Sequence, residues 1–358
     1  MKKILISTGG SGGHVIPATC LYDHMKIKFD VKIVTDVRGS KFLNIKNYPF
    51  DILKVPNIFE RFYLIPINLF FFIISIFNSF FYLKKNKIEY MFSTGGYMSL
   101  PFCLASKILK IKIFLLEPNM VLGRSNKFIL SYCNKIICYD DDIKNFPEKY
   151  NNKKFLILPL LRKEIYSYNK NLNKQFSKNI KILVIGGSQG AVFFDNMIKN
   201  VVINLSKNYK IQLTQQIYNP KIESELKKFY KEAFIENELI SFDQNLYTKF
   251  NKFDLAITRS GASAISELSY FNIPFVAIPF PAAKDDHQYY NAKYYENKNC
   301  CWILRQNEID IYKFSIFIEN ILDEKNNYFE KKENLNKISY QNTWNNINQR
   351  LINLINEN

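Results

Sequence analysis

Residues 2–18 read KKILISTGGSGGHVIPA, an apolar stretch that runs directly into a glycine-rich turn. A related stretch, IKILVIGGSQGA, occupies residues 180–191 and lacks the histidine that closes the first. A short apolar run before a glycine turn is typical of the first strand of a doubly wound α/β domain and of its ligand-facing turn. The repetition therefore predicts two such domains.

The spacing of apolar runs agrees with two domains. The 358 residues exceed the length at which a single core usually keeps growing. Apolar runs alternate with longer amphipathic stretches, which predicts parallel sheets covered by helices on both faces. The expected strands cover residues 4–7, 31–35, 90–93, 113–116, 135–138, 180–185, 211–214, 255–258, 275–278 and 301–304. We expect domains over residues 1–160 and 161–340, with a ligand-binding cleft between them.

Composition narrows the class of partner. The formal charge is +17, from 49 Lys and Arg against 32 Asp and Glu, which suits nucleic acid, an anionic membrane surface or a phosphorylated substrate. The basic residues are spread along the chain without a zinc-finger or RNA-recognition signature, so we expect no nucleic-acid partner. The six cysteines lack CxxC spacing and are predicted to be reduced, buried thiols. The apolar run before the first glycine turn is too short for a signal peptide.

Residues 62–83 form an uncharged stretch, FYLIPINLFFFIISIFNSFFYL, that is long enough to span a bilayer. It lies between strands of one predicted sheet, and a span would place those strands on opposite sides of the membrane. Two interpretations stay open beside a span: a buried helix, and a helix whose apolar face lies on a membrane surface. Lys84, Lys85 and Lys87 follow directly, where they would meet anionic head groups.

The first glycine turn offers backbone N–H groups to an anion, because glycines adopt conformations that are closed to other residues. Gly10, Gly12 and the later Asp36 imitate the dinucleotide fingerprint with its ribose-binding acid. Val15 occupies the third glycine position of that fingerprint, which disfavours an NAD enzyme. Neither glycine turn ends in the Gly-Lys-Ser/Thr of a P-loop, which disfavours an ATPase.

Further polar groups follow predicted strands. A third glycine pair occurs in STGGYMSLP, residues 93–101. Glu267 lies in the second turn of a helix expected after TRSG, where its carboxylate can accept hydrogen bonds from both hydroxyls of a ribose. His287, Gln288 and Asn291 form a polar cluster able to bind sugar hydroxyls. Together these features predict a polar, phosphate-bearing ligand.

Six stretches, in this order, together resemble the MurG family of bacterial peptidoglycan glycosyltransferases. They are TGGSGGHVIPA, STGGYMSLP, LEPNMVLGRSNK, GGSQGA, TRSGASAISE and DDHQYYNA. The resemblance implies the GT-B fold, with two Rossmann-like domains and an interdomain cleft. It also implies inverting transfer of N-acetylglucosamine from UDP-N-acetylglucosamine to lipid I, an undecaprenyl-diphosphate-linked muramoyl pentapeptide, which forms lipid II. The donor is expected on the C-terminal domain and the lipid acceptor on the N-terminal domain.

The resemblance implies roles for single residues. The donor set consists of Asn119, Arg162, Gly187, Ser188, Gln189, Gly190, Phe242, Asp243, Leu246, Glu267, His287 and Gln288. The acceptor-diphosphate set consists of Gly10, Ser11, Gly12, Gly13, Gly95, Gly96 and Tyr97. His14, in the acceptor-side turn, is the candidate base that takes the proton of the attacking hydroxyl, and Asn119 and Glu117 are the neighbouring alternatives.

Three features depart from the family pattern. His287 stands where a glutamine is common, the stretch after Ala191 lacks the usual basic residue, and TQQIYNP at residues 214–220 replaces a glycine-bearing turn. These departures concern the contacts to the donor sugar. Two other functions stay open. One is transfer of a hexose to diacylglycerol, which would use the same fold, donor turns and membrane patch, and the other is a catalytically silent UDP-sugar-binding protein that recruits others to the membrane. A lipid acceptor favours membrane docking of residues 62–84, at the cytoplasmic face of the inner membrane and beside other cell-wall synthesis proteins.

The sequence requires no metal and no cofactor. The acidic run at residues 140–142 resembles a metal triad, but acids after a strand usually start a helix, and we expect one there. Residues 341–358 are expected to form a helix with Trp344, Ile347 and Leu351 on one face. In GT-B proteins such a helix commonly packs on the first domain.

Overall fold

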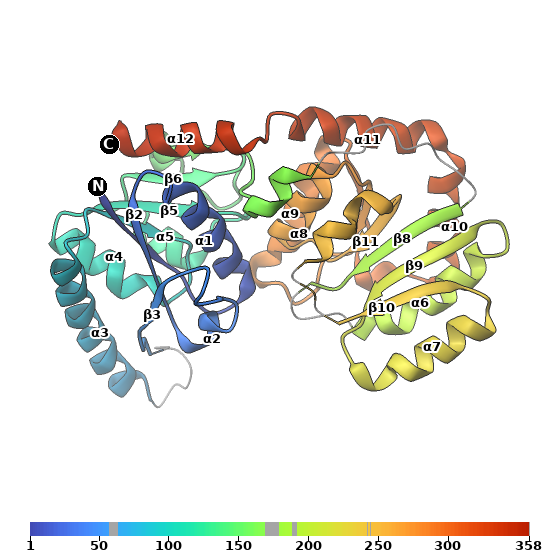
Figure 1. Ribbon diagram of the computed structural model, residues 1–358, viewed down its shortest axis with the longest axis horizontal. Helices are drawn as coiled ribbons and strands as arrows, with labels where there is room; N and C mark the ends of the chain where they lie inside the picture. The colour runs from blue at the N-terminus through green and yellow to red at the C-terminus, as the bar shows by residue number, and fades with distance from the viewer. Residues whose placement is uncertain (57–63, 169–178, 188–191, 242, 244, 358) are drawn as a thin grey trace. The chain divides into compact units, whose positions relative to one another are not determined.

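The computed structural model describes residues 1–56, 64–168, 179–187, 192–241, 243 and 245–357. The chain divides into two compact units (Figure 1). Unit 1 consists of Met1–Tyr166 and Thr343–Asn358, and unit 2 consists of Ser167–Asn342.

Within the described residues, unit 1 contains a seven-stranded parallel sheet in the order β3-β2-β1-β4-β5-β6-β7. Its strands are β1 (Lys3–Ser7), β2 (Asp30–Thr35), β3 (Phe50–Ile52), β4 (Tyr90–Ser93), β5 (Lys112–Glu117), β6 (Lys135–Cys138) and β7 (Lys154–Leu156). Its helices are α1 (Gly12–Met25), α2 (Val37–Ser40), α3 (Ile65–Asn86), α4 (Ser99–Ile108), α5 (Arg124–Ile129), α12 (Trp344–Asn356) and the 3-10 helix η2 (Glu148–Lys153).

The described part of unit 2 contains a six-stranded parallel sheet in the order β10-β9-β8-β11-β12-β13. Its strands are β8 (Asn179–Ile185), β9 (Lys210–Gln216), β10 (Glu236–Ile240), β11 (Leu255–Thr258), β12 (Phe275–Ala277) and β13 (Cys301–Ile303). Its helices are α6 (Val192–Leu205), α7 (Glu223–Glu232), α8 (Ala262–Tyr270), α9 (His287–Asn297), α10 (Ile311–Asp323) and α11 (Lys325–Ser339). The 3-10 helix η3 (Lys163–Ser167) lies at the unit boundary, and η4 (Pro220–Ile222), η5 (Leu246–Lys252), η6 (Lys284–Asp286) and η7 (Gln306–Glu308) lie in unit 2.

Both sheets share one strand order, because the first strand of each pairs with the second on one side and with the fourth on the other. This is the doubly wound arrangement, and it confirms the predicted fold class and all ten predicted strands. Strands β3, β7 and β10 were not predicted. They lie at sheet edges and carry mostly exposed or half-buried side chains, so no continuous apolar run marks them.

The central strands show why the apolar runs predict the sheets. Ile4, Leu5 and Ile6 of β1 are completely buried, because helices cover both faces of a parallel sheet. Ile182 and Leu183 of β8 are completely buried in the same way. The six cysteines are free and buried, as predicted.

Helix α3 exposes most of its apolar side chains, so the interpretation as a buried helix is wrong. Its buried positions, Phe72, Ser75, Ser79 and Leu83, recur every three or four residues, and α3 lies alongside α4 (Figure 1). Two of the four inward side chains are therefore serines, whereas the outward ones are Ile67, Leu69, Phe70, Phe71, Ile73, Ile74, Phe77 and Phe81. By length and composition α3 could cross a membrane. Only 17% of its most apolar 18-residue stretch is buried inside the protein.

The acidic run at residues 140–142 does not start a helix, which corrects that expectation. Residues 139–147 form no helix, and the Asp142 amide donates to Asp140 Oδ1 at 2.9 Å. Lys154 pairs with Asp141 at 3.2 Å, so the neighbouring strand β7 takes one of the charges. Among the described residues, no group of three His, Cys, Asp or Glu side chains is arranged to hold a metal ion.

Helix α12 contacts α1 through an aromatic cluster around His24. The His24 ring stacks on Trp344 at 3.9 Å between centroids, and Tyr166 meets both rings edge-on. His24 Nδ1 donates to Asn348 Oδ1 at 2.5 Å, whereas the buried Nε2 has no hydrogen-bond partner in the described part of the chain. Burial therefore lowers the pKa of His24 to about 4, because protonation would place a second N–H where nothing accepts it.

This cluster predicts that acid loosens α12. The pKa of His24 lies below its ordinary value, so the unfolded chain binds more protons than the folded chain between pH 6.5 and 4. The contribution of His24 to stability is complete above pH 6.5 and falls by about 3 kcal/mol as the pH drops through this window. Thermal unfolding of the wild type and of His24→Gln at pH 7 and pH 5 measures it. An equal loss of Tm in both proteins would contradict the prediction.

Candidate active site

The glycine turns of unit 1 lie at the point where its strand order reverses. Ser7 of β1 is paired with Ser93 of β4, so the turns after these strands start side by side. The Thr94 hydroxyl donates to the Thr8 hydroxyl at 2.8 Å and ties the two turns together. Ligands of doubly wound sheets bind at such switch points, outside the carboxyl ends of the strands.

His14 lies against the second of these turns. Its Nδ1 is 2.8 Å from the carbonyl oxygen of Thr94. A carbonyl only accepts, so Nδ1 carries the proton, and Nε2 of the neutral ring is left as an acceptor. Gly95 and Gly96 have φ of +89° and +80°, and a Cβ on Gly95 would lie 3.3 Å from the His14 ring. The absence of side chains at Gly95 and Gly96 therefore leaves room for the half-buried imidazole.

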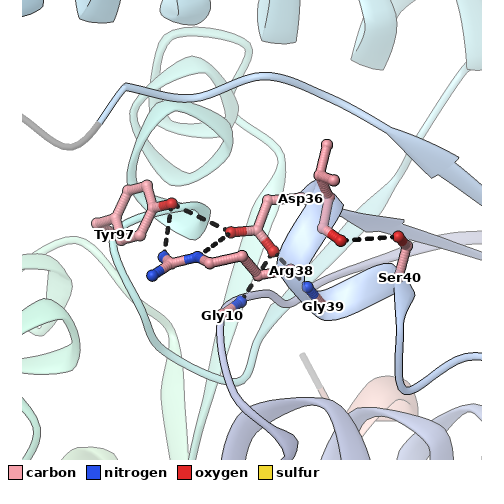
Figure 2. A network of polar contacts seen from close by, with 7 residues as sticks. Gly10, Asp36, Arg38, Gly39, Ser40 and Tyr97 are labelled. Carbon is pink, nitrogen blue, oxygen red and sulfur yellow. Dashed lines mark hydrogen bonds and ion pairs between the residues drawn. The ribbon is translucent and has the colours of Figure 1, made fainter.

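The Asp36 carboxylate anchors the first glycine turn through a hydrogen bond from the Gly10 amide (Figure 2). Its Oδ1 accepts the Gly10 amide at 2.9 Å and the Gly39 amide at 2.7 Å. Its Oδ2 accepts the Tyr97 hydroxyl at 3.1 Å and faces Arg38 Nε at 3.5 Å. Burial alone would raise the pKa of Asp36, but these donors outweigh it and hold the pKa below its ordinary range. Asp36 is thus a structural anion. Its carboxylate binds groups of the protein itself, although its position in the sequence is that of a ribose-binding acid.

The predicted acceptor-diphosphate residues surround this network. Tyr97 accepts a hydrogen bond from Arg38 Nη2 at 2.7 Å while it donates to Asp36. Ser11 is the N-cap of α1, and the turn enters α1 at Gly12 and Gly13. Because the Gly10 amide already donates to Asp36, fewer backbone donors remain in this turn than the sequence indicates.

Glu117, at the end of β5, serves as a second structural anion. Its Oε1 accepts the amide and the side-chain nitrogen of Asn119, each at 3.2 Å. Its Oε2 accepts the Gly123 amide at 2.7 Å and Asn126 Nδ2 at 3.0 Å. Both oxygens are therefore occupied, which removes Glu117 as an alternative base. Asn119 and Arg162 are half-buried and belong to unit 1, whereas the rest of the predicted donor set belongs to unit 2.

The second glycine turn begins at the equivalent position of unit 2. Gly187 has φ of +78°, and Ser188, Gln189, Gly190 and Phe242 lie outside the described residues. Gln216 braces the start of the turn, because its Oε1 accepts the Gly186 amide and its Nε2 donates to the Gly187 carbonyl, both at 3.2 Å. Gln216 belongs to the stretch TQQIYNP, which departs from the family pattern. This stretch therefore supplies the side chain that holds the turn.

Arg259 places a buried cation against Phe193 and Phe194 of α6, the helix that follows the second glycine turn. Its amide donates to Ile185 O, and its Nη1 donates to the carbonyls of Ile278 and Pro279 at 3.0 and 3.1 Å. Burial lowers the pKa of Arg259 to about 10, so the guanidinium stays charged at neutral pH, and no described carboxylate pairs with it. The sequence analysis missed Arg259, although it lies inside TRSGASAISE.

The remaining donor residues gather around helices α8 and α9. Glu267 is buried in the second turn of α8. Ser260, just before that helix, has a buried hydroxyl without a partner among the described residues, and its carbonyl accepts Asn291 Nδ2 at 3.1 Å. Gln288 Oε1 accepts the Phe280 amide at 3.0 Å, which leaves its NH₂ group for a ligand.

The other predicted residues have local roles. His287 Nδ1 is 2.8 Å from the Lys284 carbonyl, which fixes its tautomer as in His14. Asp243 is exposed and accepts the Asn245 amide at 2.7 Å, and Leu246 is buried at the start of η5. The geometry thus places Asn291 against the turn after β11 and Gln288 against the segment after β12, and it leaves Asp243 on the surface.

Family models match both halves of the chain. The glycosyltransferase family 28 N-terminal domain matches residues 4–138, and the family 28 C-terminal domain matches residues 181–347. The chain is 50% identical to a UDP-N-acetylglucosamine–N-acetylmuramyl-(pentapeptide) pyrophosphoryl-undecaprenol N-acetylglucosamine transferase of Pelagibacter ubique, over 100% of this chain and 99% of the relative. It is 33% identical to the protein of the same name from Rickettsia felis, over 91% and 92%.

Solved structures share the fold. Acinetobacter baumannii MurG superimposes with a TM-score of 0.78 at 20% identity, over 100% of both chains. A UDP-GlcNAc 2-epimerase from Neisseria meningitidis, bound to UDP-GlcNAc, superimposes with a TM-score of 0.67 at 13% identity, over 99% of this chain and 100% of that chain. With two doubly wound sheets, these likenesses bear out the predicted GT-B fold.

The contact between Gly39 and the first glycine turn predicts a stability effect. A Cβ on Gly39 would collide with Thr35 Oγ1 and lie 3.0 Å from Cα of Gly9. Gly39→Ala should therefore lower the free energy of unfolding by about 1–3 kcal/mol. Gly13→Ala is the matched control, since its Cβ would meet nothing closer than 3.6 Å and should leave stability nearly unchanged. Urea unfolding of both variants measures the difference, and equal midpoints would refute it.

Proposed function

This chain belongs to glycosyltransferase family 28 and to its MurG branch, and we propose on that basis that it transfers N-acetylglucosamine from UDP-N-acetylglucosamine to lipid I, forming lipid II. The observation that carries the proposal is 50% identity along the whole chain to a transferase named for this reaction. Two pairs of turns at two switch points add support, since each unit then offers one site for one substrate.

We assign the acceptor to unit 1 and the donor to unit 2, as the resemblance to the MurG family implies. The acceptor hydroxyl attacks the anomeric carbon of N-acetylglucosamine, the new C–O bond forms, and the bond to the UDP diphosphate breaks with inversion. The glycine turn after β8 would hold the leaving diphosphate, and the buried charge of Arg259 would stabilise it. Glu267 would accept the ribose hydroxyls, and Gln288 and His287 would contact the donor sugar. No metal takes part in these steps as proposed.

His14 is the proposed base for the acceptor hydroxyl. Its Nδ1 donates to the Thr94 carbonyl, which leaves Nε2 free to take the proton as the glycosidic bond forms. Among the described residues no group pairs with Nε2. The second glycine turn meets a leaving group and needs donors only, which explains why it lacks a histidine.

A single assay tests the proposed function. The purified protein is incubated with radiolabelled UDP-N-acetylglucosamine and lipid I in detergent, and the lipid product is separated. Formation of labelled lipid II supports the proposal. Labelled glycolipid formed only with diacylglycerol would identify a diacylglycerol hexosyltransferase, and no transfer to either lipid despite UDP binding would identify a silent binding protein.

Removal of the His14 imidazole should lower the rate of the chemical step and leave donor binding unchanged. His14→Ala is expected to lower kcat by about 100- to 10,000-fold, because the hydroxyl then has no base. UDP affinity by calorimetry and thermal stability should stay near the wild-type values. Near-normal turnover in this variant would refute the assignment.

Glu267→Ala is the donor-side comparison for that experiment. Hydrogen bonds to a carboxylate are worth about 1.5–3 kcal/mol, so this variant should bind UDP about 10- to 100-fold more weakly. The two variants together separate the acceptor step from donor binding.

We propose that α3 docks unit 1 on the membrane that carries the lipid acceptor. Its outward phenylalanines include Phe70, Phe77 and Phe81, which are 61%, 60% and 64% exposed. Lys84, Lys85 and Lys87 are exposed at its C-terminal end. Helix α3 packs on α4 and leads into β4 of the same sheet that contains β3, so it lies along the surface of unit 1 and does not separate the sheet.

Vesicle binding tests this surface. Phe70→Ser with Phe77→Ser should weaken binding to anionic vesicles by at least about 10-fold, since each phenyl ring gains about 1.5–3 kcal/mol on full burial. Added salt should weaken wild-type binding further, because it screens the lysines. Phe128→Ser removes a ring that is 59% exposed on α5 and is the control. Equal losses in both variants would contradict the assignment to α3.

A further inference from the structure

We propose that Arg38 binds the diphosphate of the lipid acceptor, and that Asp36 and Tyr97 position it for this role. The proposal rests on the proposed function, which assigns the acceptor to unit 1. It goes beyond the acceptor-diphosphate residues already named, none of which carries a positive charge. Arg38 comes from α2, which follows β2, whereas the glycine turns follow β1 and β4.

The first glycine turn by itself is poorly suited to an anion. The Gly10 amide donates to Asp36 at 2.9 Å, so it is not free for a phosphate oxygen. The same carboxylate also places a negative charge directly behind the turn, where it would repel an approaching diphosphate. A cation at the mouth of the turn offsets that charge. Arg38 is this cation, since its Nη2 lies 3.9 Å from the place of a Cβ on Gly10.

The guanidinium of Arg38 is held in place by its neighbours, but some of its N–H donors have no partner among the described residues. Its Nε faces Asp36 Oδ2 at 3.5 Å, and its Nη2 donates to the Tyr97 hydroxyl at 2.7 Å. Its carbon lies 5.3 Å from the centre of the Tyr97 ring, which adds a cation–π contact. A guanidinium has five N–H donors, and Figure 2 shows one of its nitrogens without a partner. The Arg38 side chain is 60% exposed, so those donors remain open to a ligand.

The position of His14 identifies the anion as the one carried by the acceptor. Gly96 lies between the two turns, since a Cβ there would be 3.6 Å from Gly9 O and 3.7 Å from the His14 ring. Arg38 and His14 therefore flank the same pair of turns. In lipid I the diphosphate and the attacked hydroxyl belong to one sugar, so an acceptor whose hydroxyl meets His14 brings its diphosphate to these turns. A planar, forked guanidinium matches two phosphate oxygens better than an ammonium does.

Kinetics of Arg38→Ala and Arg38→Lys test the proposal, with Lys41→Ala as the matched control from the exposed end of the same helix. Arg38→Ala should raise the KM for a short-chain lipid I by about 10- to 100-fold and leave the KM for UDP-N-acetylglucosamine and the Tm unchanged. Arg38→Lys should lie between Arg38→Ala and the wild type, and Lys41→Ala should match the wild type. An unchanged KM for the acceptor in Arg38→Ala would overturn the proposal.

A binding experiment distinguishes failure of this proposal from failure of the proposed function. The probes are farnesyl diphosphate, farnesol and inorganic diphosphate, each titrated against the wild type and Arg38→Ala by calorimetry. The proposal expects Arg38→Ala to weaken farnesyl diphosphate binding about 10-fold or more and farnesol binding not at all. An equal effect on inorganic diphosphate would assign the site to the phosphates alone. A wild type that makes no lipid II but shows this difference would refute the proposed function and keep Arg38 as an anion-binding residue.

A purely structural role gives a different pattern. If Arg38 only braces Asp36, Arg38→Ala should lower the Tm and Tyr97→Phe should lower it to a similar extent, with both substrates affected together. Arg38→Lys then serves as the second variant, because it keeps a cation near Asp36. Full recovery of Tm in Arg38→Lys without any change in acceptor KM would overturn the proposal.

Discussion

The divergence of two paired parallel strands is the constraint on which the proposed sites depend. In unit 1, β1 and β4 pair along their length, but the chain continues from them to opposite sides of the sheet. Unit 2 repeats this with β8 and β11. The turns that leave such a pair must separate, and their backbone groups then have no strand to pair with. Every residue proposed here to act on phosphate or sugar lies on one of these turns or on a neighbouring element.

The two units satisfy their turns with opposite charges. Unit 1 uses the buried carboxylates Asp36 and Glu117, each of which accepts hydrogen bonds from backbone amides and side chains on its two oxygens. Unit 2 uses the amide of Gln216 and the cation Arg259, which holds carbonyls. In the proposed reaction, the diphosphate of the donor would meet the buried positive charge of Arg259 in unit 2. The proposed acceptor site of unit 1 has buried carboxylates instead, so the cation we propose there is Arg38 at the surface.

Helix α3 shows how far composition and burial can differ. Two of its four buried positions are serines, whereas Phe70, Phe71, Phe77 and Phe81 are exposed, which reverses the pattern of a helix on a water-soluble protein. Small side chains at the buried positions allow close contact with α4, whereas the exposed rings of Phe70 and Phe71 contact each other edge-on. In the proposed docking mode, this exposed apolar face of α3 meets the membrane surface, and the strands before and after α3 stay in one sheet.

The sequence alone determined the fold class and ten of the thirteen described strands, because apolar runs and glycine turns are local patterns that a parallel sheet requires. It did not indicate β3, β7 and β10, whose short, exposed edges need no apolar run. The quoted stretches contained the glycine turns, His14 and Glu267. Only the tertiary structure decided that Asp36 is an internal anion, that Glu117 is occupied, and that Arg38 lies beside Gly10. The contacts of Asp36 with Gly10 and Tyr97 join residues 26 and 61 positions apart, and such contacts arise from strand pairing, which no local pattern encodes. The contacts of Glu117 lie within nine positions of it, but no motif in the sequence marks them.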